Sequence, residues 1–399
     1  MAFTMAPLLP ILYFLVSMFF SMVALNSRPS RRPTLLAVLV LFALLAFHGI
    51  TDVAQSLEQA DVLGLFILIY ISHMGCVLLV ERHELPGCAG GWKVKSSYKM
   101  MFNCRWIGTE RQAPDICEHS PSAINGPSQN SERDAKLITC PQKLRKTLFQ
   151  SRRAAFLRNR LLSALTIYGL NYLYWQLFLT PHPLYYRPLE YSDLIPSKQT
   201  YIRRIHDVTG RETIIRSIAV FNFVWSAWAL FTGLHDILAF VFVGIGLDKP
   251  QDWPPLYGRL DQMYTLRRFW GKFWHRLVYR SYTGCGILLS EKIFRLPSDS
   301  GVGRLLINFI VFFLSGIVHA LVTWKLGFTC GYWEDIGWFC LNFLGILLEE
   351  GIQWVYSKCF NVDGKINTTR KVIGFLWVFG FFFWSLPKTQ YPKMFCRPM

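Results

Sequence analysis

The hydrophobic positions of the chain fall into long runs that are separated by polar, mostly basic segments. An α-helix needs about 20 largely apolar residues to cross the hydrocarbon core of a bilayer, so runs of this length predict membrane-spanning helices. Eight such runs are present: 8–25, 34–50, 62–80, 161–179, 214–232, 305–324, 336–356 and 372–386. A shorter apolar stretch, 235–247, either extends the fifth run or re-enters the membrane. The pattern predicts an all-α, polytopic transmembrane bundle of about eight spans.

The runs divide the chain into three predicted parts. Residues 1–80 hold three N-terminal transmembrane helices, 81–160 form a long basic loop, and 161–399 hold the remaining five runs. Near the end of the loop, 136–160 mixes many basic residues with Leu, Phe and Ala. That composition favours an amphipathic helix that lies on the membrane surface.

Composition agrees with a membrane protein. Charged residues make up 17% of the chain, against roughly 25% in typical soluble domains, while aromatic residues reach 16% and mean hydropathy is +0.28. Small soluble enzymes, disordered scaffolds and secreted disulfide modules are excluded. The ten cysteines are scattered without zinc-like spacing, and several lie in or beside apolar runs, so we expect them to act mainly as small hydrophobic residues.

Charge sets the expected orientation. The net charge of +17 comes from 42 Lys+Arg against 25 Asp+Glu, and the basic residues lie mostly between the apolar runs. Cytoplasmic loops collect Lys and Arg, which face anionic headgroups and phosphates, so we expect contact with membrane lipid and not with nucleic acid. Residues 81–160 carry 15 basic and 7 acidic residues, whereas 51–61 has no Lys or Arg. Both termini are therefore predicted to be luminal, in a multi-pass protein of the endoplasmic reticulum, with Arg203, Arg204 and Arg211 in 181–212 as an exception.

Several classes of membrane enzyme can be tested by their motifs. The nine histidines are isolated, so the clustered boxes that hold a di-iron site are missing, and no aspartate cluster could hold magnesium diphosphate. The chain also lacks a Gly-x-Ser-x-Gly elbow, a P-loop and a Gly-x-Gly-x-x-Gly turn. We therefore expect no bound metal and no permanently bound cofactor.

One candidate group lies inside an apolar run. His319 follows about 12 residues of hydrophobic helix, and Ser315 and Gly316 precede it on about the same turn. An ionisable side chain at that depth is costly and suggests function, and histidine suits general-base work near neutral pH. The alternative is a histidine that hydrogen-bonds to a carbonyl of a neighbouring helix. The residues alone leave both interpretations open.

A second candidate is the aromatic and basic segment 266–280. It holds five aromatic residues (Phe269, Trp270, Phe273, Trp274 and Tyr279), one glycine and five basic residues. It favours either an interfacial helix on anionic lipid or a cationic, aromatic lip that receives a phosphorylated cosubstrate beside the membrane. Glu349 and Glu350 lie near the cytoplasmic end of the seventh run, where ion pairing is favoured over catalysis.

Together, the motifs Phe269-Trp-Gly-Lys-Phe-Trp-His275 and Ser315-Gly-Ile-Val-His319 resemble the wax synthase domain of the membrane-bound O-acyltransferase superfamily. The chain is most similar to fungal acetyltransferases that esterify terpenoid and meroterpenoid hydroxyl groups. The similarity extends from about Arg158 to the C-terminus, while the first 150 residues are alike only in being hydrophobic and then basic. The resemblance implies a helical bundle around an internal tunnel, with acyl-CoA entering from the cytoplasm and a lipophilic alcohol from the membrane.

The resemblance also implies roles for particular residues. His319 corresponds to the histidine that deprotonates the hydroxyl. His275 stands where related sterol and diacylglycerol acyltransferases have Asn, and it can donate a hydrogen bond to the developing oxyanion. The expected acyl-CoA contacts are Arg267, Arg268, Phe269, Trp270, Gly271, Lys272 and Trp274. Residues expected to line or support the tunnel are Ser315, Gly316 and Glu350.

The leading hypothesis is therefore an acyl-CoA-dependent O-acyltransferase that uses acetyl-CoA as cosubstrate and a lipophilic secondary-metabolite alcohol as acceptor. One alternative is a wax or sterol ester synthase with a long acyl chain. An alternative of another class is a membrane transporter in which His319 and Glu350 relay protons. The sequence fixes neither the alcohol nor the oligomeric state.

The orientation gives a first testable prediction. Asn367-Thr-Thr369 is an N-glycosylation sequon, but basic residues around it, including Arg370 and Lys371, keep its loop cytoplasmic. Asn367 is therefore expected to stay unmodified in the endoplasmic reticulum. Wild type and Asn367→Gln should migrate identically before and after glycosidase treatment. A glycosidase-sensitive shift that Asn367→Gln abolishes would contradict this orientation.

Overall fold

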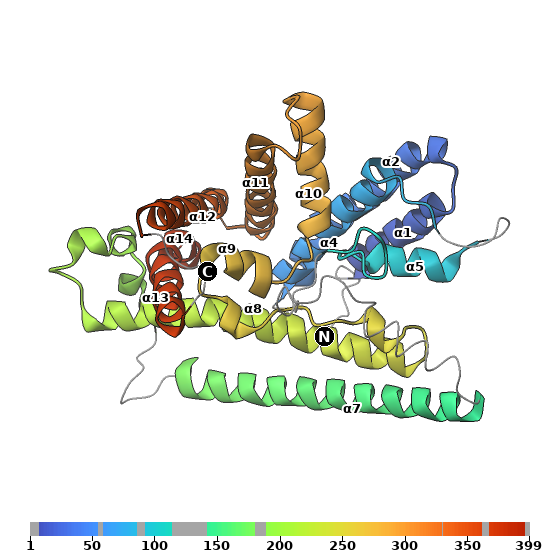
Figure 1. Cartoon of the computed structure of the whole chain (residues 1–399), viewed down its shortest axis with the longest axis horizontal. Helices are drawn as coiled ribbons and strands as arrows, with labels where there is room; N and C mark the ends of the chain where they lie inside the picture. The colour runs from blue at the N-terminus through green and yellow to red at the C-terminus, as the bar shows by residue number, and fades with distance from the viewer. Residues whose placement is uncertain are drawn as a thin grey trace.

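The computed structural model describes residues 8–54, 59–85, 92–113, 142–179, 189–328, 330–360 and 367–395, and all regular secondary structure in these ranges is helical (Figure 1). Short π-helical turns follow α4, α7, α9 and α10. The α-helices are α1 (Leu8–Leu25), α2 (Arg32–His48), α3 (Ile50–Ala54), α4 (Ala60–Gly75), α5 (Val94–Phe102), α7 (Gln142–Tyr174), α8 (Gly210–Gly244), α9 (Leu266–Arg268), α10 (Tyr279–Leu288), α11 (Gly301–Lys325), α12 (Tyr332–Phe360), α13 (Thr368–Ser385) and α14 (Pro387–Phe395).

Six helical stretches in the described part of the chain are long and apolar enough to cross a membrane. They are Leu8–Leu25, Pro29–Ala54, Ala60–Val80, Gly210–Gly244, Gly301–Lys325 and Thr368–Met394. Together with the family match reported below, they identify an integral membrane protein. The other two predicted runs lie in α7 with the π-helical turn after it and in α12, where Asn171 and Gln176, and Glu349 and Glu350, respectively, interrupt the apolar sequence.

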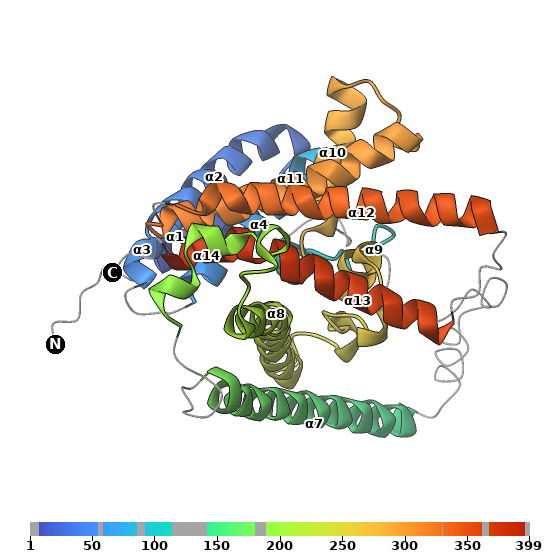
Figure 2. The same cartoon turned by 90° about the vertical axis from the view of Figure 1, so that its left-hand side faces the viewer.

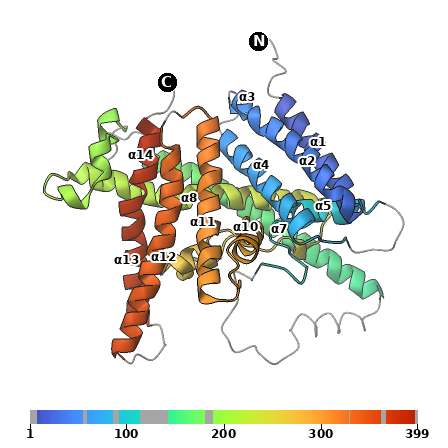
Figure 3. The ribbon, with the colours of Figure 1, turned by 90° about the horizontal axis from the view of Figure 1, so that it is seen from above.

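The structure joins segments that the sequence pattern separated. The predicted surface helix 136–160 and the run 161–179 are continuous in α7, although residues 136–141 lie outside the described ranges. The stretch 235–247 extends the fifth run, because α8 continues to Gly244 without a break. In Figures 1 and 3 α7 and α8 lie side by side and cross the bundle of upright helices. Of the two alternatives for 235–247, extension of the fifth run is therefore confirmed, and the described part of 136–160 is helical as expected.

A buried ion pair holds α7 against α8. The Arg160 guanidinium binds the Asp236 carboxylate at 2.5 Å and the carbonyl oxygen of Trp253 at 2.6 Å. Asp236 is buried, and a buried carboxylate needs such a partner. Asp236 therefore supplies the carboxylate that the basic α7 binds.

Two groups of helices run across the direction of α8 in Figure 3. In Figure 3 α1, α2 and α4 form one group and α11, α12 and α13 the other, and in Figure 2 α12 and α13 run alongside each other. Within the first group, the Tyr70 hydroxyl donates to Ser21 at 2.7 Å. The groups meet where α4 contacts α11: a Cβ on Gly64 would lie 3.2 Å from the side chain of Val322. Small residues at such contacts let helices approach closely.

The segment between α7 and α8 explains the exception in the charge pattern. Two of these arginines are ion-paired: Arg204 with Glu212 at 2.8 Å and Arg211 with Asp193 at 2.6 Å. Asp193 and Glu212 are buried. Arginines neutralised in this way contribute less to the count that sets orientation.

One cysteine departs from the expected hydrophobic role. Cys330, in the loop between α11 and α12, is disulfide-bonded. Cys76, Cys104, Cys285 and Cys340 are free thiols that lie in or near helices. Cys330 lies outside the apolar runs, where its sulfur is accessible to oxidation.

The closest helix contact involves Gly316. A Cβ built on this residue would lie 2.7 Å from Cα of Ile336 and 3.3 Å from the carbonyl oxygen of Asp335. Both contacts are with backbone, which has little freedom to move. Gly316, which the resemblance placed at the tunnel, therefore allows α11 and α12 to touch.

This contact predicts the effect of adding one methyl group. Gly316→Ala should push α11 away from α12 and destabilise the protein by about 1–3 kcal/mol. Gly337→Ala is the matched control in α12, because its Cβ would meet nothing within 4 Å, and alanine favours helix over glycine. The melting temperature of detergent-solubilised protein should fall for Gly316→Ala alone. Equal melting temperatures would contradict the close contact.

Candidate active site

A large cavity of about 2760 Å³ lies beside α11. Its lining begins near Gly301 and Arg304 at the start of α11 and continues to Val318 and His319. Other walls come from α4, α5, α8, α12 and α14, and from the segment between α9 and α10. Most of the lining is apolar and aromatic, as in sites that bind lipophilic ligands.

His319 lies on the cavity wall, six residues before the last residue of α11. Its ring stacks on Phe339 of α12, with centroids 5.0 Å apart and planes 25° apart. Ser315 lines the cavity one turn earlier, but its hydroxyl donates to its own helix, to Val311 O at 2.8 Å. Of the predicted group, His319 and Ser315 face the cavity, whereas Gly316 faces α12.

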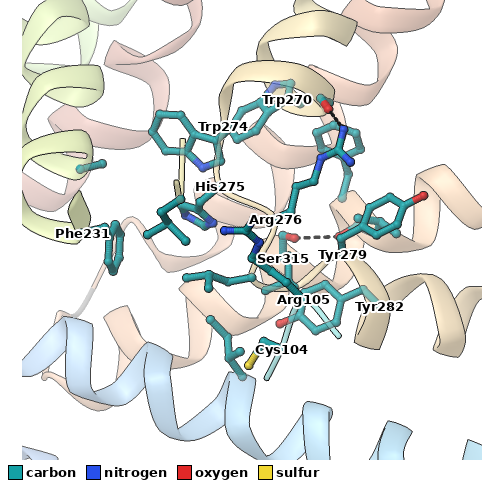
Figure 4. Close-up of a pocket in the computed structure, with 18 of the residues that line it drawn as sticks. Cys104, Arg105, Phe231, Trp270, Trp274, His275, Arg276, Tyr279, Tyr282 and Ser315 are labelled. Atoms are coloured by element: carbon teal, nitrogen blue, oxygen red, sulfur yellow. Dashed lines mark hydrogen bonds between the residues drawn. The ribbon is translucent and has the colours of Figure 1, made fainter. Parts of the chain in front are cut away.

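His275 lines the same cavity from the segment after α9. Its ring lies among Phe231 (5.3 Å), Trp274 (5.5 Å) and Tyr257 (5.7 Å), measured between centroids. In Figure 4 it lies between the Phe231 ring and the tryptophans. Its Nδ1 atom is buried without a hydrogen-bond partner among the described residues. Burial lowers the pKa of His275 to about 4, and the nearby His319 adds to the lowering, so the imidazole is neutral at pH 7.

The segment that carries His275 is held by hydrogen bonds at its start. The Thr265 side chain accepts from Arg268 N at 3.0 Å and caps α9. The buried Glu349 carboxylate accepts from Leu266 N at 2.7 Å and from the Trp377 indole at 3.0 Å. These bonds link the start of the segment to both α12 and α13.

Aromatic packing fixes the rest of this segment. A π-helical turn, Phe269–Phe273, closes with a hydrogen bond from Trp274 N to Phe269 O at 2.8 Å. Phe269, Phe273 and Trp274 are buried in a core shared with α8, α12 and α13. The interpretation as an amphipathic helix on the membrane surface is therefore wrong, because the rings pack inside the protein.

The structure distributes the predicted acyl-CoA contacts unevenly. Phe269 is buried beneath the cavity wall and is not part of its lining, and Trp270 is fixed by a bond from its indole to Asn342 at 3.1 Å. Arg268 stacks over Tyr264 at 4.7 Å, and Arg267 forms an exposed pair with Glu350 at 3.1 Å, as expected for that glutamate. The predicted residues that line the cavity are Arg267, Arg268, Trp270, Gly271, Lys272 and Trp274, together with Glu350.

Several lining residues were not predicted. Asn342, which is not part of the lining but holds the lining residue Trp270, was not predicted either; a lone amide among the apolar residues of the seventh run was the available signal. Cys104 and Arg105 come from the chain after α5 and lie on the side of the cavity opposite the tryptophans (Figure 4). Arg105 donates to the carbonyl oxygen of Pro255 at 2.8 Å. Only the fold brings this N-terminal segment to the site, and no sequence pattern marked it.

Charged side chains of the lining lie at both ends of the stretch that follows α11. Arg304 is near the start of α11. Asp335, near the start of α12, and Lys393, near the end of α14, lie beyond His319. Within the described ranges, no three His, Cys, Asp or Glu side chains converge as metal ligands would. The described lining therefore brings two imidazoles, several basic side chains and a largely apolar wall to one cavity.

Comparison with known proteins identifies this region. The model of the membrane bound O-acyl transferase family matches residues 253–341, which include His275, His319 and the aromatic segment between α9 and α10. Over these residues the chain is similar to the membrane bound O-acyl transferase family. No solved structure matches the chain.

The chain is also similar to several fungal proteins that are named as acetyltransferases. The chain is 35% identical over 190 residues to "Acetyltransferase atnC" of Arthrinium sp, covering 47% of this chain and 43% of that protein. It is 34% identical over 148 residues to "Acetyltransferase spyB" of Aspergillus fumigatus, covering 34% of this chain and 25% of that protein. It is 31% identical over 158 residues to "Acetyltransferase ataH" of Aspergillus terreus, covering 40% of this chain and 52% of that protein. The chain thus spans about half, or less, of the length of these relatives.

Proposed function

We propose that the protein is an acyl-CoA-dependent O-acetyltransferase. It transfers acetyl from acetyl-CoA to a hydroxyl group of a lipophilic terpenoid or meroterpenoid alcohol. The observation that carries the proposal is that His275 and His319 line one largely aromatic cavity within the family-matched segment. The fungal acetyltransferases to which the chain is similar support acetyl as the acyl group.

In the proposed reaction His319 acts as general base. Its imidazole takes the proton of the acceptor hydroxyl while that oxygen attacks the thioester carbonyl. The tetrahedral intermediate then expels the CoA thiolate, which receives the proton from His319, so the products are the acetyl ester and CoA. The stack on Phe339 restricts the histidine ring, and the apolar wall keeps water from the thioester.

His275 is suited to stabilise the oxyanion. A neutral imidazole carries one N–H donor, and the unpartnered Nδ1 leaves hydrogen-bonding capacity inside the cavity. The surrounding rings of Phe231, Tyr257 and Trp274 exclude water and hold the imidazole in one orientation. A donor fixed in this way strengthens its interaction with developing negative charge without reorganisation.

The basic groups at one end of the cavity suit the phosphates of CoA. Arg268, Lys272 and Arg304 all line it. Cations in a cleft attract phosphate and form charge-assisted hydrogen bonds with its oxygens. The donor therefore enters near the start of α11 and extends its thioester toward His319.

The disulfide of Cys330 supports an orientation with this entrance in the cytoplasm. Disulfides persist in the lumen of the endoplasmic reticulum and are rare in the cytosol, so the loop between α11 and α12 is luminal. The basic residues Arg304 and Arg370 lie at the opposite ends of α11 and α13. Two independent features, the charge pattern and the disulfide, thus favour the same orientation in the endoplasmic reticulum membrane.

The donor site can be tested with Lys272→Ala. Loss of one charge-assisted phosphate contact should cost about 1.5–3 kcal/mol and raise the KM for acetyl-CoA more than that for the alcohol. Arg259→Ala is the control, because Arg259 is exposed, pairs with Asp261 and does not line the cavity. Steady-state kinetics of purified protein should show the change for Lys272→Ala only. Equal effects on both substrates would contradict this role.

The proposed base gives the central test. His319→Ala should lower ester formation by about 10²–10⁴-fold, the typical value of a general base, without unfolding the protein. His275→Ala should also be impaired, and His275→Asn should recover part of the rate if the side chain only donates a hydrogen bond. The assay is transfer of radiolabelled acetyl from acetyl-CoA, compared with palmitoyl-CoA, to lipid-extractable alcohols.

The control variant is His206→Ala, because His206 is exposed and outside the cavity. All variants should be purified in equal yield and as monodisperse protein. Near-normal acetyl transfer by well-folded His319→Ala would refute the proposed mechanism. A preference for palmitoyl-CoA would instead favour wax or sterol ester synthesis.

A further inference from the structure

A cluster of polar side chains lies where α11, α12 and α14 meet, and neither the family motifs nor the proposed chemistry uses it. The Asp335 carboxylate accepts from the hydroxyls of Thr323 at 2.9 Å and Thr389 at 2.8 Å, and it pairs with the Lys393 ammonium at 2.5 Å. We refer to these four residues as the Asp335 cluster. Asp335 is only 4% exposed, so its charge is compensated locally by these partners.

The cluster lies about one helical turn from the proposed base. His319 stacks on Phe339, and Thr323, four residues later on α11, binds Asp335, four residues earlier on α12. The antiparallel helices α11 and α12 therefore contact each other at two positions one turn apart, His319–Phe339 and Thr323–Asp335. Four residues of helix rise roughly 6 Å, which sets the spacing between the imidazole and the carboxylate along the helix axis.

The cluster faces the cavity that holds the histidines. Asp335, Thr389 and Lys393 all line it, and Gln390 adds an amide to the same wall. The Lys393 side chain keeps 26% of its surface exposed, and an ammonium group has three N–H donors, of which the pair with Asp335 uses one. Lys393 can therefore donate to a ligand without leaving Asp335.

The rest of the wall near His319 offers little polarity. It consists largely of aromatic and aliphatic side chains, including Phe312, Trp338 and Phe339, and the Ser315 hydroxyl already donates to its own helix. The donor phosphates have their cations near the start of α11, on the far side of His319. A polar group beyond His319 is therefore available to the acceptor and not to CoA.

We propose that Lys393, held by Asp335, binds a second oxygen of the acceptor alcohol, a hydroxyl or carbonyl group about one helical turn from the hydroxyl that is acetylated. The proposal rests on the proposed function and specifies its substrate class: an oxygenated polycyclic alcohol and not a simple fatty alcohol. In an apolar site, a small number of polar groups commonly fixes the orientation of the ligand. Here they select which hydroxyl reaches His319.

The test is a competition between sterol probes. Each reaction contains 5α-cholestan-3β-ol and one analogue that carries an additional oxygen at carbon 6, near the 3-hydroxyl, or on the distal side chain. The ratio of acetylated products, measured by mass spectrometry, reports the ratio of kcat/KM, and damage to folding or donor binding cancels in it. Wild type should favour the analogue oxygenated at carbon 6 by roughly 10- to 100-fold, the usual effect of a hydrogen bond to a charged group.

Three variants separate binding from structure. Lys393→Met keeps the aliphatic stem but removes the donor, so its product ratio should fall at least tenfold toward one, and Lys393→Arg should retain most of the preference. Lys388→Met is the matched control on α14, because Lys388 stacks over Trp384 at 4.5 Å and does not line the cavity. Its ratio should equal that of wild type.

The outcomes distinguish this inference from the proposed function. Acetylation of both probes with a ratio that Lys393→Met leaves unchanged, or a wild-type preference for the distal oxygen, would overturn the inference and leave the acetyltransferase intact. If no probe is acetylated, the acetyltransferase proposal fails for this class of acceptor. The inference is then decided by thermal stabilisation in detergent, where the analogue oxygenated at carbon 6 must stabilise wild type more than Lys393→Met.

Discussion

The buried carboxylate of Glu349 is the interaction on which the arrangement of the site depends. The segment after α9 has only one turn of α-helix and one π-helical turn, so it cannot hold itself in place by a long hydrogen-bond ladder. Glu349 binds Leu266 N and the Trp377 indole, and it joins this segment to α12 and α13. Once the start is anchored, the aromatic rings determine where the segment ends, and His275 follows directly.

This anchoring explains why the motif is so aromatic. Each of Phe269, Trp270 and Trp274 contacts several other rings from α8, α12 and α13. Ring pairs contribute about 0.5–1.5 kcal/mol beyond their burial and prefer defined geometries. A short, irregular segment gains from them the rigidity that a regular helix gains from its backbone. One edge of the segment, formed by Trp270, Gly271 and Trp274, lies on the cavity wall.

The sequence predicted the regular part of this structure and the positions of its two histidines. Long apolar runs locate helices reliably because membrane crossing demands both length and composition, and all eight runs lie in helices. The depth of His319 in its run marked it without any tertiary information. The burial of Phe269 could not be predicted, because an aromatic and basic segment suits both an interface and a core until its neighbours are known.

Other features depended on contacts between distant segments. The continuity of α7 could not be predicted, since surface-helix and transmembrane compositions meet within it without a turn signal. Arg105 reaches the cavity from a loop with no distinctive pattern, and Lys393 becomes part of it only because α14 folds back onto α11 and α12. Sequence periodicity reports the face of one helix; it does not report which helix that face meets.

The position of His319 along α11 gives the proposed reaction a direction. From Gly301 to His319 the helix rises roughly 27 Å at 1.5 Å per residue, and the cavity follows it over that length. A donor that binds its phosphates near Arg304 must therefore be long and thin to bring its thioester to the histidine, which suits the pantetheine arm of CoA. The acceptor meets the thioester near the other end of the helix, where only a short space separates His319 from the Asp335 cluster. In the proposed reaction a long acyl chain would compete with the acceptor for the cavity near His319, whereas an acetyl group would leave it to the acceptor.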